Sequence, residues 1–152
     1  YSWPVMTKPV WYYVGYYGGN VKSTIVGIGN PAIWWVGIPC QVFVLVHGIL
    51  KKDKRAAFLF LAYLAQYVPW MSISRITFIY HYFPAILFTI LMMGYVIHLL
   101  LTKFPKSKIA ITVYLVIAIA CFFVFYPVVS GFPVSREYGM HLRLLKDWIL
   151  VL

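Results

Sequence analysis

Acidic residues are almost absent from this sequence of 152 residues. It has only Asp53, Glu137 and Asp147 against 13 lysines and arginines, so its formal net charge is +10. Asp53 lies in a basic segment, and the other two lie near the end of the chain. A carboxylate that acts as a general base must lie within hydrogen-bonding reach of the reacting proton. The sequence therefore excludes a complete carboxylate-based active site built from this chain alone.

Cysteine is also scarce, and the motifs of several other chemistries are missing. Cys40 and Cys121 lie in apolar runs, where a thiol is typically a small buried hydrophobe and a disulfide framework is not expected. No glycine-rich phosphate loop, Ser-His-Asp or Cys-His combination is found. His47 and His98 have no acidic or cysteine partner at their depth, so we expect hydrogen bonds between helices there and no metal site.

Apolar residues, in contrast, make up 63% of the chain, and aromatic residues make up 20%. They form four long runs, at 32–50, 56–73, 82–101 and 109–129. A helix needs about 20 apolar residues to cross a hydrocarbon core of roughly 30 Å. The sequence therefore predicts an all-α integral membrane protein with four transmembrane helices. The run at 56–73 is the weakest, because Gln66, Pro69 and Ser72 interrupt its outer end.

The positive charges are concentrated in short connections between the apolar runs. KKDKR occupies 51–55 and KFPKSK occupies 103–108. The positive-inside rule places both connections in the cytoplasm, and residues 1–30, the loop around Arg75 and the tail 131–152 on the extracytoplasmic side. Because no basic face belongs to a polar fold, nucleic-acid binding is not expected.

Three regions follow from this topology. Residues 1–30 are expected to form an aromatic extracytoplasmic loop, and residues 31–130 the four-helix transmembrane region. The tail 131–152 mixes charged and apolar residues, which predicts a short amphipathic helix lying in the membrane interface. Gln41 and Gln66 come near mid-membrane on neighbouring runs, so we expect them to hydrogen-bond to each other.

The stretch SRITFIYHYFPA (74–85) contains the candidate functional residues. An arginine at mid-bilayer is costly, so Arg75 is expected at the outer rim, where it either reaches the headgroup layer or binds a phosphate through its planar fork of donors. His81, flanked by Tyr80 and Tyr82, is either a structural hydrogen-bonding residue or part of the same rim. Together these four residues predict a cationic and aromatic site for a phosphate and sugar.

Several segments also carry a resemblance to a known family. WPVMTKPVWYY (3–13), GNPAIWW (29–35), LAQYVPWMSISRITFIYHYFPA (64–85) and VSREYGMHLRLLKDW (134–148), in this order and separated by apolar runs, resemble the C-terminal four-span region of protein O-mannosyltransferases. The resemblance implies a membrane glycosyltransferase of the GT-C type. Such an enzyme moves a sugar, usually mannose, from a polyprenyl-phosphate carrier to Ser or Thr of a protein on the extracytoplasmic side.

The resemblance also implies roles for individual residues. Arg75 and His81 match basic positions of the loop motif and are expected near the donor phosphate, with Tyr80 and Tyr82 shaping the pocket. Four residues of GNPAIWW are expected to position the outer loop: Asn30, Pro31, Trp34 and Trp35. The family's catalytic acid belongs to an N-terminal half, so no catalytic residue is assigned to this chain, which is expected to be inactive alone.

The implied partners are that N-terminal half, the lipid-linked donor, a Ser/Thr-containing acceptor protein and membrane lipid. No cofactor beyond the donor is expected. The residues of WPVMTKPVWYY resemble those of bacterial members of the family, which predicts that the protein lies in a bacterial cell membrane. Two alternatives stay open at this stage. One is a non-catalytic membrane scaffold or transport subunit, and the other is a GT-C transferase that acts on a lipid or glycan acceptor.

Overall fold

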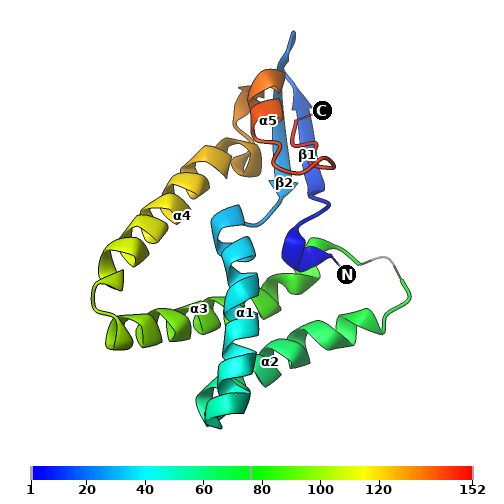
Figure 1. The fold of residues 1–152 in the computed structure, drawn as a ribbon. Coiled ribbons are helices and arrows are strands. Elements are labelled where there is room, and N and C mark those ends of the chain that lie inside the picture. Colours follow the sequence, from blue (N-terminus) through cyan, green and yellow to red (C-terminus); the bar gives the residue numbers. More distant parts are fainter. Residues whose placement is uncertain (1, 76, 152) are drawn as a thin grey trace.

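Four long helices dominate the fold (Figure 1). The computed structural model describes residues 2–75 and 77–151. The long helices are α1 (Pro31–Lys51), α2 (Lys54–Met71), α3 (Phe83–Lys103) and α4 (Ser107–Ser130). Each begins and ends within two residues of a predicted apolar run. The positions of the four helices are therefore confirmed.

Local signals explain where these helices begin and end. The Asn30 side chain accepts a hydrogen bond from the Ala32 amide at the start of α1, and Asp53 Oδ1 accepts from the Arg55 and Ala56 amides at the start of α2. Such N-caps satisfy backbone donors that have no partner within the helix. α4 ends at Gly131, whose φ of +86° is favourable for glycine.

Within the described residues, three helical segments are long and apolar enough to cross a membrane: Pro31–Lys51, Ile79–Lys103 and Ser107–Ser130. α1, with 21 residues, is about 31 Å long at 1.5 Å per residue. α2 does not belong to this group. It contains the run that the sequence marked as weakest, so the prediction of four spans is supported for three helices.

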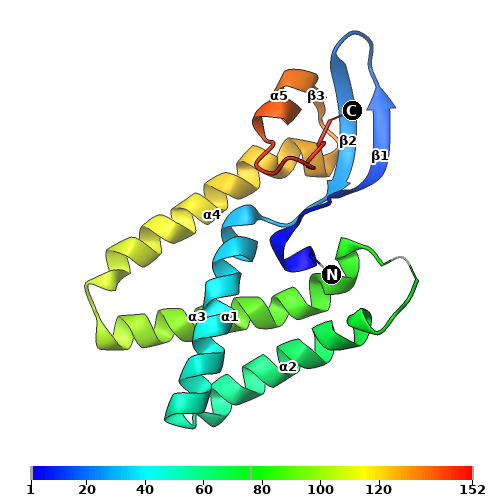
Figure 2. The same ribbon diagram turned by 45° about the vertical axis from the view of Figure 1, so that its right-hand side comes forward.

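The prediction that the fold is all-α, with residues 1–30 as a loop, is wrong. β1 (Val10–Tyr16) and β2 (Val21–Gly27) form an antiparallel hairpin, and β3 (Pro133–Ser135) pairs with β2 to complete a three-stranded sheet (Figure 2). The two long strands are rich in β-branched and aromatic residues. Gly18 and Gly19 lie between them with φ of +91° and +59°, as a tight hairpin turn requires.

The tail contains a short helix, as the sequence predicts, but this helix covers only its first part. α5 spans only Arg136–His141, and the chain then returns along the hairpin. Trp11 Nε1 donates to the Ile149 carbonyl at 2.8 Å, and Thr24 Oγ1 donates to the Leu150 carbonyl at 3.0 Å. Trp148 is buried in the core. These hydrogen bonds and the burial of Trp148 explain why the end of the tail follows an irregular path and does not continue as a longer helix.

The main helix crossing joins α1 to α3. Gly37 allows this close approach, since a Cβ atom there would overlap the Thr89 side chain. Gln41 Nε2 donates to Thr89 Oγ1 at 2.7 Å, also across this crossing. Gln66 is exposed on α2, so the predicted pair between Gln41 and Gln66 is wrong. The nearer hydroxyl on α3 takes the place of Gln66 as the partner of Gln41.

The two histidines near the basic connections behave differently. His47 Nδ1 lies 3.2 Å from the Tyr95 hydroxyl on α3, which confirms a hydrogen bond between helices. The same hydroxyl donates to Asp53 Oδ2 at 2.7 Å. His98 is exposed, and its carbonyl oxygen accepts from Thr102 within α3. In the part of the chain that the structure describes, no three His, Cys, Asp or Glu side chains gather as metal ligands.

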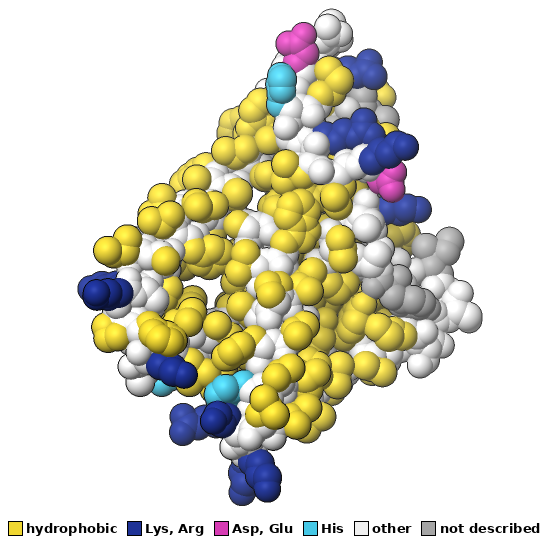
Figure 3. All heavy atoms as spheres, viewed as in Figure 1, with side chains coloured by type: hydrophobic (Ala, Val, Ile, Leu, Met, Phe, Trp, Pro, Cys, Tyr) yellow, Lys and Arg dark blue, Asp and Glu magenta, His cyan; other side chains and the backbone are white. Residues whose placement is uncertain are grey.

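Basic side chains gather at two opposite ends of the visible face (Figure 3). A mainly apolar surface separates the two ends. The sheet, α5 and the tail lie at the upper end in Figures 1 and 3, and we call this the sheet end. Several of the largest fully buried side chains belong to it, among them Trp148, Leu150 and Val26. The core therefore extends from the helices into the sheet end.

Candidate functional site

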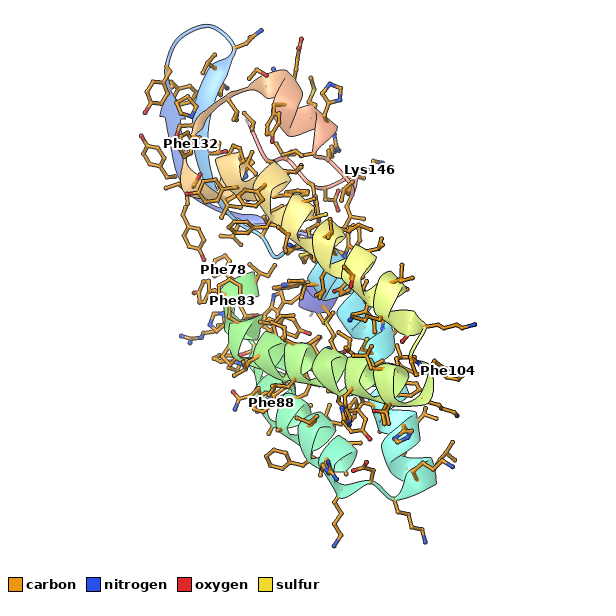
Figure 4. The ribbon with its side chains drawn as sticks, turned by 90° about the vertical axis from the view of Figure 1, so that its left-hand side faces the viewer. Phe78, Phe83, Phe88, Phe104, Phe132 and Lys146 are labelled. Atoms are coloured by element: carbon orange, nitrogen blue, oxygen red, sulfur yellow. The ribbon has the colours of Figure 1, made fainter. Side chains whose placement is uncertain are left out.

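The connection between α2 and α3 carries the candidate residues of the loop motif. The 3₁₀-helix η2 (Ile79–Tyr82) leads directly into α3. Arg75 lies in this connection and is exposed. Phe78 and Phe83 lie at this end of α3, and Phe104 lies at the opposite end (Figure 4). The connection is therefore at the end of α3 far from the basic segment 103–108.

Aromatic rings surround His81. Its ring centroid lies 4.3 Å from that of Tyr80, in a stacked arrangement, and 4.4 Å from that of Trp70, edge to face. Trp3 of the N-terminal 3₁₀-helix η1 (Trp3–Val5) lies parallel to it at 6.2 Å. Three segments of the chain thus hold one imidazole, and His81 remains partly exposed.

The backbone of Phe78 orients the His81 ring. The Phe78 amide lies 3.2 Å from Nδ1, and the Phe78 carbonyl oxygen lies 3.1 Å from it. A neutral ring that accepts from the amide carries its proton on Nε2, and a protonated ring that donates to the carbonyl also has a proton there. In these two states Nε2–H is a donor for an anion, whereas a neutral ring that donates from Nδ1 to the carbonyl has an acceptor at Nε2.

Tyr82 points away from the rim and into the helix junction. Only 1% of its surface is exposed. Its hydroxyl lies 3.2 Å from the Tyr63 hydroxyl on α2 and accepts from Gln41 Nε2 on α1 at 3.4 Å. Tyr82 therefore fixes the α2–α3 connection to two other helices, and it does not line an open pocket.

The GNPAIWW segment joins α1 to its surroundings. Asn30 Nδ2 donates to the Ala118 carbonyl of α4 at 2.8 Å, while its Oδ1 caps α1. Pro31 occupies the first turn of α1, where its missing amide proton costs nothing. One asparagine therefore both starts α1 and connects it to α4.

Trp34 connects this segment to the α2–α3 connection. Its buried ring lies 5.1 Å from the Tyr82 ring and 6.5 Å from the Phe83 ring, between centroids. Gly29 lies so close to this indole that a Cβ atom would overlap it. The glycine of GNPAIWW is therefore a packing requirement of Trp34.

Two tryptophans hold η1 in place. Trp35 Nε1 donates to the Val5 carbonyl at 3.0 Å, and Trp148 Nε1 donates to the Met6 carbonyl at 2.6 Å. The two indoles lie 5.9 Å apart, between centroids. Since η1 supplies Trp3 to the His81 cluster, Trp35 and Trp148 position one wall of the candidate site from a distance.

Two adjoining hollows lie beside the N-terminal segment that contains η1. The first, of about 480 Å³, runs between the start of the chain and the α2–α3 connection, with Trp3, Thr77 and Phe78 among its lining residues. The second, of about 500 Å³, is cationic: Lys8, Trp11, Arg143, Lys146 and Asp147 line it. The two hollows share Lys8 and Pro9. A continuous surface thus connects the His81 region to three basic side chains.

The structure brings together some of the predicted site residues. Tyr80 and His81 are stacked, Arg75 is exposed on the same connection, and Tyr82 is buried beneath it. Sequence reasoning missed the basic hollow. Its cations lie in WPVMTKPVWYY and VSREYGMHLRLLKDW, which were quoted for the resemblance but given no role. Only the fold places these distant segments side by side.

Comparison with known proteins places this arrangement in a family. The family described as the C-terminal four transmembrane region of protein O-mannosyltransferase matches residues 1–148. A polyprenol-phosphate-mannose–protein mannosyltransferase of Mycobacterium tuberculosis is 25% identical, over 90% of this chain and 29% of the relative. Dolichyl-phosphate-mannose–protein mannosyltransferase 1 of Saccharomyces cerevisiae is also 25% identical, over 97% of this chain and 20% of the relative.

A third relative, protein O-mannosyl-transferase 2 of Drosophila melanogaster, is 30% identical over 62% of this chain and 13% of the relative. The chain thus spans less than a third of the length of each of these relatives. No solved structure matches it. The apolar helices and the family match together show an integral membrane protein. The chain belongs to the family of C-terminal transmembrane regions of protein O-mannosyltransferases.

Proposed function

We propose that this chain is the part of a protein mannosyltransferase that receives the phosphate of a polyprenyl-phosphate mannose donor at the extracytoplasmic face. The single observation that carries the proposal is the exposed Arg75 on a connection that Tyr82 and Trp34 hold against the helices. The names of the bacterial and yeast relatives specify a polyprenol- or dolichyl-phosphate-mannose donor and a protein acceptor.

The chemistry at the phosphate suits the residues of this connection. Negative charge develops on the phosphate as the bond to the sugar breaks, and preorganised donors stabilise it. Arg75 supplies a permanent charge and a planar set of donors, and His81 supplies Nε2–H. The neighbouring rings of Tyr80 and Trp70 offer apolar faces next to the phosphate site.

The remaining chemistry belongs to the rest of the protein. A Ser or Thr hydroxyl of the acceptor needs a general base. Asp53 lies at the basic end of α1, and Glu137 and Asp147 lie in the tail. We therefore assign the base to a segment outside this chain. By its resemblance to bacterial members, we place the protein in a bacterial cell membrane, with the sheet end outside.

Arg75→Ala in the complete protein tests the proposal. Loss of a hydrogen bond to a charged group costs about 1.5–3 kcal/mol, so transfer from polyprenyl-phosphate mannose to a Ser/Thr peptide should fall at least about tenfold. Lys106→Ala, in the basic connection before α4, is the matched control and should leave transfer unchanged. Unchanged turnover and donor affinity in Arg75→Ala would exclude the assigned role.

Two further outcomes separate the alternatives. A larger loss of transfer in Lys146→Ala than in Arg75→Ala would indicate that the donor phosphate binds in the basic hollow. Normal donor binding without transfer to any Ser/Thr peptide would indicate a lipid or glycan acceptor, and no donor binding at all would indicate a scaffold.

A further inference from the structure

A groove between α1 and α3 lies at the end of the protein that carries the basic connections. It has a volume of about 540 Å³. Pro39, Phe43, Leu99, Leu100 and Phe104 give it a mainly apolar lining. In Figure 4, Phe104 lies at the end of α3 opposite to Phe78 and Phe83. The groove is therefore distinct from the site proposed for the donor phosphate.

The mouth of this groove is cationic. Lys51 is the last residue of α1 and Lys103 is the last residue of α3, and both line the groove and are exposed. His47 belongs to the wall, since its ring stacks on Phe43 with centroids 5.6 Å apart and its Nδ1 lies 3.2 Å from the Tyr95 hydroxyl. Two lysines thus belong to the lining of an otherwise mainly apolar trough.

The length of the groove matches one leaflet of a bilayer. Its lining on α1 runs from Pro39 to Lys51, which lie twelve positions apart, or about 18 Å at 1.5 Å per residue. Half of a hydrocarbon core of roughly 30 Å is about 15 Å. A chain that lies in the groove would therefore reach the bilayer centre while its head lies level with the lysines.

From this geometry we propose that the groove binds one anionic phospholipid of the leaflet that faces the basic connections. The acyl chain lies along Phe43, Leu99 and Leu100, and the headgroup phosphate lies between Lys51 and Lys103. Charge complementarity favours this occupant over a further protein helix, because an apolar helix laid here would bury two ammonium groups without a counter-charge. The proposal does not depend on the transfer reaction.

Native mass spectrometry of the complete purified protein in detergent tests this proposal. The protein is titrated with phosphatidylglycerol or phosphatidylcholine, and the number of retained lipids is measured. Each lysine near an anionic lipid contributes about fivefold in affinity. Lys51→Ala/Lys103→Ala should therefore weaken the tightest phosphatidylglycerol site by about 25-fold and leave phosphatidylcholine binding unchanged.

Lys106→Ala/Lys108→Ala is the matched control. It removes the same charge from the same region, but neither residue lines the groove. Its phosphatidylglycerol affinity should stay within about twofold of the wild type. Leu99→Trp fills the trough without changing charge and should also abolish the tight site.

Three results would overturn the proposal. The first is an equal loss in both double variants, which would indicate general electrostatic attraction. The second is retention of the tight site in Leu99→Trp. The third is a wild-type protein that shows no preference for phosphatidylglycerol, as expected if another part of the protein covers the groove. Transfer activity is not the readout, so failure here is distinguishable from failure of the donor-site proposal.

Discussion

The Trp34 ring packs against the Tyr82 ring with centroids 5.1 Å apart, and both side chains are buried. This contact joins the GNPAIWW segment at the start of α1 to the connection that carries Arg75 and His81. Gly29 makes room for the indole, and the Tyr82 hydroxyl continues the connection to Tyr63 on α2. Two of the four segments that carry the family resemblance thus form one structural unit.

Gly29→Ala should destabilise the protein through this unit. The new Cβ atom would overlap the Trp34 indole, which the Tyr82 and Phe83 rings hold in place. Overpacking of this kind costs about 1–3 kcal/mol. Thermal unfolding in detergent measures the effect. Gly94→Ala is the control, because no atom lies within 4 Å of a Cβ atom there and alanine favours the helix. Equal melting temperatures for the two variants would contradict the packing role.

Tyr82→Phe should weaken the anchoring of the α2–α3 connection. The change removes a buried hydroxyl that lies near Tyr63 and Gln41, and the loss of a buried hydrogen bond costs about 0.5–1.5 kcal/mol. Tyr80→Phe removes a hydroxyl from a side chain that is 42% exposed and should change stability by less than about 0.5 kcal/mol. Chemical denaturation of the two variants side by side measures the difference, and a larger effect at Tyr80 would argue against the anchor.

His81→Phe separates a stacking role from a phosphate contact. Phenylalanine preserves a ring between Tyr80 and Trp70 but has no Nε2–H donor. We expect His81→Phe and His81→Ala to lose affinity for the polyprenyl-phosphate donor about equally, by about tenfold, because both lack the hydrogen bond to the charged phosphate. Donor binding curves measure this loss. Wild-type affinity in His81→Phe alone would show that the ring acts only by packing.

Asp53 makes stability sensitive to acid. The hydrogen bond from the Tyr95 hydroxyl, and next the one from the Arg55 amide, lower the pKa of Asp53 below its ordinary value of about 3.9. A lowered pKa stabilises the folded protein above the unfolded-state pKa, and this stabilisation is lost as pH falls through the folded-state pKa. Asp53→Asn should therefore unfold at a lower temperature than the wild type at pH 7.

The difference between the two melting temperatures should shrink as the pH falls below about 4, because the wild-type carboxylate is then protonated. Unfolding scans of both proteins from pH 7 to pH 3 test this. A difference that stays constant with pH would show that the Asp53 charge makes no contribution.

The hairpin illustrates a signal that was present but not used. VWYYVGY and VKSTIVG flank a turn that contains Gly18 and Gly19, and this pattern is typical of a β-hairpin. The abundance of tyrosine and glycine favoured an interfacial loop instead. β3 had no such signal, because three residues pair with β2 only after the chain has returned from α4.

The sequence alone determined the four helices and the separation of the basic connections from Arg75, because hydropathy, helix caps and charge clusters act over short distances along the chain. It also placed Tyr80 beside His81, and the two rings stack in the structure. The tertiary structure decided the rest. Trp148 donates to Met6 across 142 positions and Trp11 donates to Ile149 across 138, and no local pattern encodes such pairs. The burial of Tyr82, the basic hollow at Lys8 and the groove below Lys51 and Lys103 exist only because packing brings distant segments together.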